Sequence, residues 1–164
     1  MYLNHLWMLS EYHIKYHLAG LGKRYLPPAD LSRSLDTIPG LDVHACGTSV
    51  EGRPIVVAEL GSGPIRVLMW SQMHGNEATT TRAVADLLHL LAGKDPISQD
   101  LRRALTIRVL PQLNPDGAQA YTRENAAGVD LNRSRMRAVL MAVLALFVWL
   151  IWPLMGMAVT LPSP

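Results

Sequence analysis

Short runs of β-branched and apolar residues, separated by turn-forming residues, predict several strands in the middle of the chain. Residues 43–46 predict a short strand, residues 55–60 a second strand, and residues 65–70 a third, more buried one. Residues 61–64 leave only a short link between the last two. These two strands are therefore predicted to run antiparallel.

A helix and a further strand follow the third strand. Four apolar residues at helical spacing predict a helix over residues 78–92, which Gly93 is placed to end. Residues 105–113 predict a strand after it. Because a strand, a crossover helix and a strand form a parallel unit, the pattern predicts an α/β fold with a mixed, mostly parallel sheet and packed helices. The four apolar residues are Val84, Leu87, Leu88 and Leu91.

The chain divides into three predicted regions. Residues 1–40 are expected to form an N-terminal helix and loop, residues 41–133 a partial α/β domain, and residues 134–164 a basic linker with a hydrophobic tail. Within the second region, residues 114–133 are polar and loop-like, and their first four residues, Asn-Pro-Asp-Gly, form a strong turn sequence.

Composition excludes some classes of function. The 164 residues carry 15 Lys and Arg against 13 Asp and Glu, a balance that does not suggest a nucleic-acid partner. Cys46 is the only cysteine, so there is no internal disulfide, and we interpret it as a small buried hydrophobic residue. Residues 1–22 lack the basic start and unbroken apolar stretch of a secretory signal peptide.

The first group of candidate chemical residues follows the third predicted strand. His74 and Glu77 stand three apart, where the loops of an open α/β sheet form the ligand crevice. Imidazole and carboxylate are both normal zinc ligands, and Gly75 would let the chain turn sharply between them. On spacing alone, such a pair on a surface loop is more often simply solvated.

A second group lies in the polar stretch 121–133. Two arginines and an asparagine there can hold a carboxylate, because Arg binds it through a two-pronged fork and Asn adds a neutral donor. For any one of these residues, a solvated basic loop is the simpler interpretation. The group comprises Arg123, Asn125, Asp130, Asn132 and Arg133.

Two further histidines stand out in the N-terminal region. His13 and His17 are four residues apart, so on a helix they would share a face and could chelate a metal ion. The favoured interpretation is two partly exposed histidines on an amphipathic helix, and neither is assigned to the zinc site.

The ordered combination of motifs is more specific than any one of them. His-Gly-Asn-Glu at residues 74–77, Asn-Pro-Asp-Gly at residues 114–117 and Thr-Arg-Glu-Asn-Ala-Ala-Gly-Val-Asp-Leu-Asn-Arg at residues 122–133 together resemble the zinc carboxypeptidase family, the carboxypeptidase A-like metallocarboxypeptidases. The stretches at residues 22–27 and 49–55 also look like that family. The resemblance runs from about residue 22 to residue 133 and covers the family's N-terminal part only.

The resemblance implies a truncated α/β/α domain with zinc as its cofactor and peptide or protein C-termini as substrates. His74 and Glu77 match the family's first two zinc ligands, and Arg123 matches the arginine that polarises the scissile carbonyl. Asn132 and Arg133 match the pair that grips the free C-terminal carboxylate. Zinc is a Lewis acid that lowers the pKa of bound water toward ~7, and a preorganised arginine stabilises developing charge.

The chain departs from the family pattern after Arg133. The family needs a third zinc ligand, a histidine, and a glutamate as general acid and base, and many members use a tyrosine, but no His, Glu or Tyr follows Arg133. Catalytic zinc sites normally use three protein ligands. The sequence therefore predicts a metallocarboxypeptidase that is incomplete in this chain. The alternative is a catalytically inactive relative, membrane-tethered or fragmentary, that at most binds peptide C-termini.

Residues 138–161 form a separate apolar tail with no charged residue and no histidine. As a helix they would reach ~36 Å, enough to cross a bilayer core of ~30 Å. One interpretation is a membrane anchor, which would make the protein membrane-associated. The other is a frame change just after Arg133, which would produce a chance hydrophobic peptide. Both interpretations stay open.

Overall fold

The computed structural model describes residues 10–133. The chain divides into two compact units, residues 1–130 and residues 131–164. The apolar helix predicted for residues 138–161 lies outside the described residues. Among residues 10–133, no helix is both long enough and apolar enough to cross a membrane.

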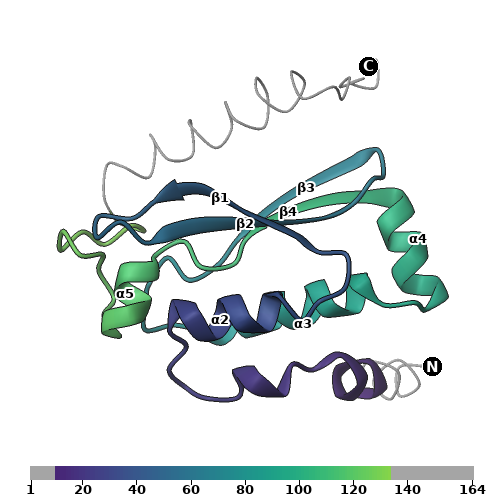
Figure 1. Cartoon of the computed structure of the whole chain (residues 1–164), viewed down its shortest axis with the longest axis horizontal. Helices are drawn as coiled ribbons and strands as arrows, with labels where there is room; N and C mark the ends of the chain where they lie inside the picture. The colour runs from purple at the N-terminus through teal and green to yellow at the C-terminus, as the bar shows by residue number, and fades with distance from the viewer. Residues whose placement is uncertain (1–9, 134–164) are drawn as a thin grey trace. The chain divides into compact units, whose positions relative to one another are not determined.

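The first unit contains a four-stranded sheet (Figure 1). Its strands are β1 (Asp42–Thr48), β2 (Pro54–Gly61), β3 (Ile65–Trp70) and β4 (Leu105–Leu110), in the spatial order β1-β2-β4-β3. The β1/β2 and β2/β4 pairs are antiparallel, and β3/β4 is parallel. The strands predicted at residues 43–46, 55–60 and 65–70 are thus confirmed.

The sheet is mixed as predicted, but the expectation that it is mostly parallel is wrong for the described strands. Two of its three pairings are antiparallel. Parallel neighbours need a long crossover, and here only β3 and β4 are joined by one, whereas β1 and β2 are joined by a short turn. Strands β2 and β3 do run antiparallel, but β4 lies between them.

Helices cover the sheet on one side. The predicted helix over residues 78–92 is confirmed as α3 (Thr79–Ala92), and Gly93 follows it in an extended conformation. Helix α2 (Pro28–Leu35) lies on the same side of the sheet as α3 (Figure 1). The described residues therefore show a helix layer and a sheet layer of the expected α/β/α arrangement. Residues 10–16 are helical, and η1 (Ala19–Leu21) is a single 3-10 turn.

Three helices that were not predicted each begin with proline. Proline occupies the first turn of α2, of α4 (Pro96–Ala104) and of α5 (Pro115–Ala120). In the first turn of a helix, a backbone N–H has no intrahelical acceptor, so proline loses no hydrogen bond there. The fixed φ of proline also suits a helix. The turn predicted at residues 114–117 is therefore wrong, since Asn114 caps α5 instead.

The hydrophobic core lies between the helices and the sheet. Leu35 of α2, Leu88 of α3 and Val109 of β4 are almost completely buried in one cluster. Full burial of a side chain of this size contributes ~1.5–3 kcal/mol. Cys46, predicted to be buried, is exposed, because it lies on β1, a mostly exposed strand at the sheet edge.

Candidate metal centre

The loop between β3 and α3 carries the predicted metal ligands. The backbone N–H of Ser71 donates to the carbonyl of Leu110 at 3.0 Å, so the loop leaves the sheet beside the end of β4. The N–H of Glu77 then donates to the carbonyl of His74 at 3.1 Å and closes a turn. His74 is only 8% exposed, whereas the Glu77 side chain is 59% exposed. The two side chains thus lie at the boundary between protein and solvent.

A buried hydrogen-bond network holds this loop in place. Gln72 has a left-handed backbone (φ 49°), and its amide donates to the carbonyl of Gly75 at 2.7 Å. Its side-chain oxygen accepts from the hydroxyl of Thr81 at 2.8 Å and from the amide of Gln112 at 3.0 Å. The Gln72, Thr81 and Gln112 side chains therefore satisfy one another away from water, which fixes the backbone that bears His74. No spacing pattern in the sequence singles out these residues.

Gly75 is required for a reason other than the predicted sharp turn. Its backbone is not left-handed. A Cβ atom at this position would lie 1.8 Å from the backbone carbon of Gly117, so only glycine lets the loop approach α5. Asn114 joins the same two elements: its side-chain oxygen accepts from the N–H of Gly117 at 2.9 Å, and its amide donates to the carbonyl of Met73 at 3.1 Å.

Four polar side chains form a closed ring at this loop. His74 Nδ1 is 3.2 Å from Glu77 Oε2, and His74 Nε2 is 3.2 Å from Asp130 Oδ1. Arg123 completes the ring, because Nε donates to Asp130 Oδ2 and Nη1 donates to Glu77 Oε1, each at 3.0 Å. Three of the predicted site residues, His74, Glu77 and Arg123, therefore lie together. Asp130 was singled out only as part of the carboxylate-binding group, and its contact with His74 was missed.

This arrangement fits two ligands of a zinc ion. The facing donor atoms of His74 and Glu77 are close enough for one ion at ~2.0–2.2 Å from each to bridge them. Asp130 binds the other ring nitrogen, as carboxylates do beside metal-ligating histidines. A cavity of about 170 Å³ opens beside the pair. Among residues 10–133, no third His, Cys, Asp or Glu side chain lies close enough to form a three-ligand metal site with His74 and Glu77.

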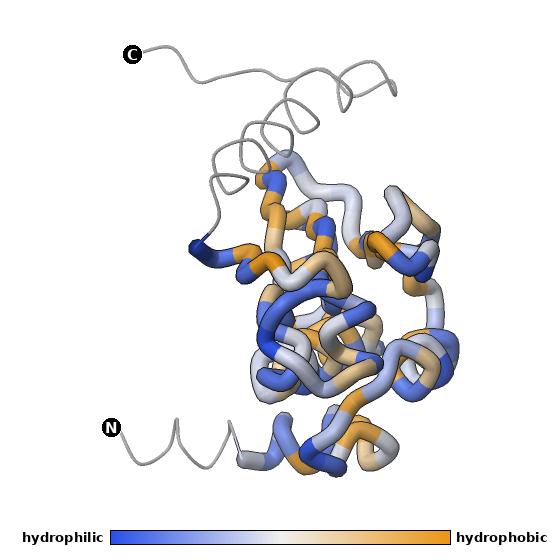
Figure 2. The backbone as a smooth tube through the Cα atoms, turned by 90° about the vertical axis from the view of Figure 1, so that its left-hand side faces the viewer, coloured by the Kyte–Doolittle hydropathy of each residue, from blue (hydrophilic) through white to orange (hydrophobic). Residues whose placement is uncertain are grey.

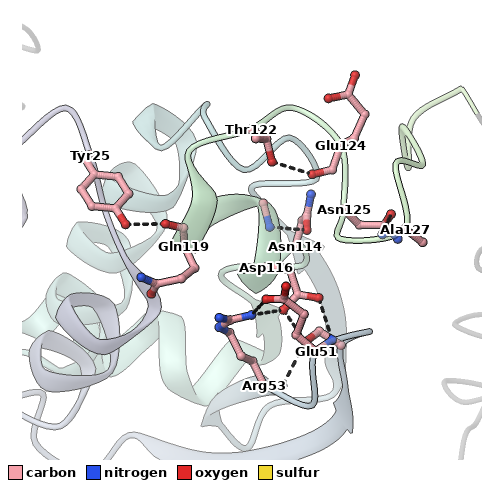
Figure 3. Close-up of polar contacts among 12 residues, drawn as sticks. Tyr25, Glu51, Arg53, Asn114, Asp116, Gln119, Thr122, Glu124, Asn125 and Ala127 are labelled. Carbon is pink, nitrogen blue, oxygen red and sulfur yellow. Dashed lines mark hydrogen bonds and ion pairs between the residues drawn. The ribbon is translucent and has the colours of Figure 1, made fainter.

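The remaining residues of the second sequence group behave differently. The Asn125 side-chain oxygen accepts from the N–H of Ala127 at 3.0 Å (Figure 3). It also accepts from the N–H of Val129 at 2.9 Å, so Asn125 shapes its own loop. Asn132 and Arg133 belong to the second unit, where they form a turn; Asn132 is half-buried and Arg133 exposed.

Asp116 connects two further stretches that the sequence singled out, residues 49–55 and 114–117. Its carboxylate accepts from the Ser49 hydroxyl at 2.7 Å, the Glu51 N–H at 3.1 Å and Arg53 Nη1 at 2.6 Å (Figure 3). Burial acts to raise the pKa of Asp116, but the hydrogen bonds from Ser49 and Arg53 outweigh it and lower the pKa from its usual value. The β1–β2 turn is thereby tied to α5.

The family model described as zinc carboxypeptidase matches residues 32–149. The chain belongs to the zinc carboxypeptidase family. The matched residues include the whole ring of His74, Glu77, Arg123 and Asp130.

Curated carboxypeptidases are similar to this chain over part of their length. Carboxypeptidase SOL1 of Arabidopsis thaliana is 30% identical over 100 residues, which cover 56% of this chain and 20% of that protein. The human carboxypeptidase N catalytic chain is 32% identical over 133 residues, which cover 64% of this chain and 29% of that protein. The chain thus spans less than a third of the length of either relative.

A solved metallo-carboxypeptidase structure has the same fold over most of this chain. The metallo-carboxypeptidase from Burkholderia cenocepacia is 28% identical, with a TM-score of 0.62, and the match covers 74% of this chain and 37% of that one. The mixed α/β architecture is therefore the carboxypeptidase-like fold.

Proposed function

We propose that this chain carries part of the site of a zinc-dependent carboxypeptidase, which removes C-terminal residues from peptides or proteins. His74 Nδ1 and one carboxylate oxygen of Glu77 hold the zinc ion. The observation that carries the proposal is the ring in which Asp130 binds the far side of the His74 imidazole while Glu77 faces its near side. If His74 and Glu77 were only a solvated pair on the surface, the His74 imidazole would not need to be buried with a carboxylate beside each of its nitrogens.

Each member of the ring has a separate task in this proposal. Bound zinc supplies a Lewis acid and lowers the pKa of water. Asp130 accepts a hydrogen bond from the Nε2–H of His74, which leaves Nδ1 without a proton and free to act as a ligand. Arg123 is held between Asp130 and Glu77, so its remaining N–H donors are oriented before substrate arrives and stabilise charge that develops on the scissile carbonyl.

Asn132 and Arg133 bind the free carboxylate of the substrate. The support is their match to the family motif and the geometry of the guanidinium fork, which fits a carboxylate with two parallel hydrogen bonds. Recognition of a terminal carboxylate restricts cleavage to the last peptide bond. Peptide and protein C-termini are therefore the proposed partners.

A second candidate function is peptide binding without catalysis. It is favoured by the two-ligand site, because no third ligand-type side chain joins His74 and Glu77 among residues 10–133. In this form the same Arg123, Asn132 and Arg133 hold a peptide C-terminus. The apolar helix predicted for residues 138–161 would then serve as a membrane tether.

Zinc stoichiometry tests the metal ligands. The 164-residue chain with His74→Ala should bind one zinc ion fewer per chain than the unchanged protein, measured by competition with a chromogenic chelator. His44→Ala is the matched control, since His44 is a half-exposed histidine on β1 outside the ring, and it should leave the stoichiometry unchanged. Equal stoichiometry in the His74→Ala and unchanged chains would reject the site.

Calorimetric peptide binding tests carboxylate recognition apart from catalysis. A peptide with a free C-terminus should bind, and the same peptide with an amidated C-terminus should not. Arg133→Ala should abolish this difference, whereas Arg103→Ala, which removes an exposed arginine of α4, should preserve it. Preference for the free C-terminus that survives Arg133→Ala would contradict the assigned role.

A further inference from the structure

A second group of metal-ligating side chains lies on the N-terminal helical segment, residues 10–16 and the adjoining His17. The N–H of His17 donates to the carbonyl of His13 at 2.8 Å, so one helical turn separates the two histidines. Their ring centroids are 5.1 Å apart, and both residues are exposed. Imidazoles at i and i+4 of a helix share a face and can bind one ion together.

The third member of the group comes from α3. Asp86 Oδ2 is 3.0 Å from His17 Nδ1, and Asp86 Oδ1 accepts from the N–H of Leu18 at 2.9 Å. One donor atom each of His13, His17 and Asp86 all lie within 4.8 Å of one another. Donors at ~2.0–2.1 Å from a tetrahedral zinc ion are ~3.3 Å apart, so the side chains need only a small rotation to close on an ion.

Other contacts fix the segment in position without any ion. Lys15 Nζ lies 2.8 Å from Asp95 Oδ1, and the Tyr16 hydroxyl donates to the other oxygen of Asp95. His89 of α3 is hydrogen-bonded to the carbonyl of Tyr16 at 2.9 Å. The residues at this end of the described chain are mostly hydrophilic (Figure 2), but Tyr16 is buried with its ring against that of His89. The metal-donor atoms are therefore close together before an ion binds, which lowers the conformational entropy that is lost on metal binding.

We propose that His13, His17 and Asp86 form a second divalent-metal site, separate from His74 and Glu77, that takes zinc. Two imidazoles and one carboxylate are a donor set that suits zinc, and the fourth position of the tetrahedron is left to water. Because the ligands come from two elements, the ion clamps the N-terminal segment to α3, the helix that follows Glu77. The site does not depend on the proposed peptidase function.

The first test uses the full chain with His74→Ala and Glu77→Ala, so that the ring contributes no binding. This protein should bind one zinc ion. Addition of His13→Ala should weaken binding by at least ~10-fold, the lower end of what loss of an outer-shell partner costs. His13 is exposed, and its replacement leaves the contacts of Lys15, Tyr16 and Asp86 in place. His44→Ala in the same background should change nothing. Unaltered affinity after His13→Ala would overturn the proposal.

Thermal unfolding provides the second readout. Zinc should raise the melting temperature of the His74→Ala, Glu77→Ala chain, because an ion that binds only the folded state stabilises it. Asp86→Asn keeps an oxygen that can accept from the N–H of Leu18 but removes the negative charge, so this variant should fold and should lose most of the shift. A zinc-dependent shift of the same size in Asp86→Asn, or no shift in the parent chain, would mean that the three residues are a solvated surface group.

Discussion

Asp130 acts on His74 although 56 residues separate them in the sequence. Its carboxylate binds the imidazole nitrogen on the far side from Glu77, and Arg123 holds its second oxygen. At the scale of single residues, the ring therefore has an order: Arg123 positions Asp130, and Asp130 positions His74. A change at Asp130 should therefore alter the proposed metal site without removing either of its proposed ligands, His74 and Glu77.

Asp130→Asn tests this order. We expect zinc affinity of the ring to fall by ~10–100-fold, the usual effect of losing a carboxylate behind a ligating histidine. The measurement is chelator competition in a His13→Ala background. Glu124→Gln, an exposed carboxylate in the same loop, is the control and should leave the affinity unchanged. Equal affinity for Asp130→Asn and Glu124→Gln would show that Asp130 does not orient His74.

Gly75→Ala tests the close approach of the loop to α5. The added methyl group would overlap the backbone of Gly117, so we expect the free energy of unfolding to fall by ~1–3 kcal/mol, the usual cost of overpacking. Denaturant titration measures it. Gly47→Ala is the matched control, because a Cβ at Gly47 meets nothing within 4 Å. Similar stability of the two variants would contradict the packing argument.

At the scale of elements, the β1–β2 turn and α5 are joined through one buried carboxylate. The Asp116 side chain is only 2% exposed and holds Ser49, Arg53 and the Glu51 backbone together. The loop bearing His74 also packs closely against α5, through Gly75. Loss of Asp116 should therefore destabilise both the β1–β2 turn and the loop that bears His74.

Asp116→Asn should lower the free energy of unfolding at pH 7 by ~1–3 kcal/mol, the cost of leaving buried donors poorly satisfied. The folded-state pKa of Asp116 is lowered from its usual value, so the stability that Asp116 contributes is complete above the unfolded-state pKa and is lost as the pH falls through the folded-state pKa. Denaturant titrations at pH 7 and below pH 3.8 should show a smaller acid-induced loss in the variant. Asp100→Asn, at an exposed ion pair, is the control. An unchanged acid-induced loss in Asp116→Asn would exclude this linkage.

At the scale of the whole molecule, residues 10–133 place two proposed zinc ligands, His74 and Glu77, at the ring and no third. Supplied with zinc, the purified 164-residue chain should release C-terminal amino acids at a rate lower by ~10²–10⁴-fold than a complete family member, the usual contribution of one general acid or base. Release of amino acids from a short peptide, followed by mass spectrometry, measures this. Efficient zinc-dependent release that Glu77→Ala abolishes would prove the prediction wrong.

The sequence predicted the local elements better than their arrangement. Helix α3 was predictable because its apolar stripe has a clear period, and the family motif led directly to His74 and Glu77. The position of β4 between β2 and β3 was not, because pairing between residues far apart leaves no periodic signal. The contact of Asp130 with His74 was hidden for the same reason. The assignments of Asn132 and Arg133 stay predictions.

The place of β4 has a consequence for the order in which the chain folds. Ala58 of β2 pairs with Val109 of β4, whereas the β1–β2 hairpin pairs residues much nearer in sequence. Long-range pairing requires the closure of a large loop and is slow. During synthesis on the ribosome, the hairpin can form early, but β3 has no sheet neighbour among the described strands until β4 has emerged. The loop that bears His74, at the end of β3, therefore folds only after α3 and α4 have been synthesised.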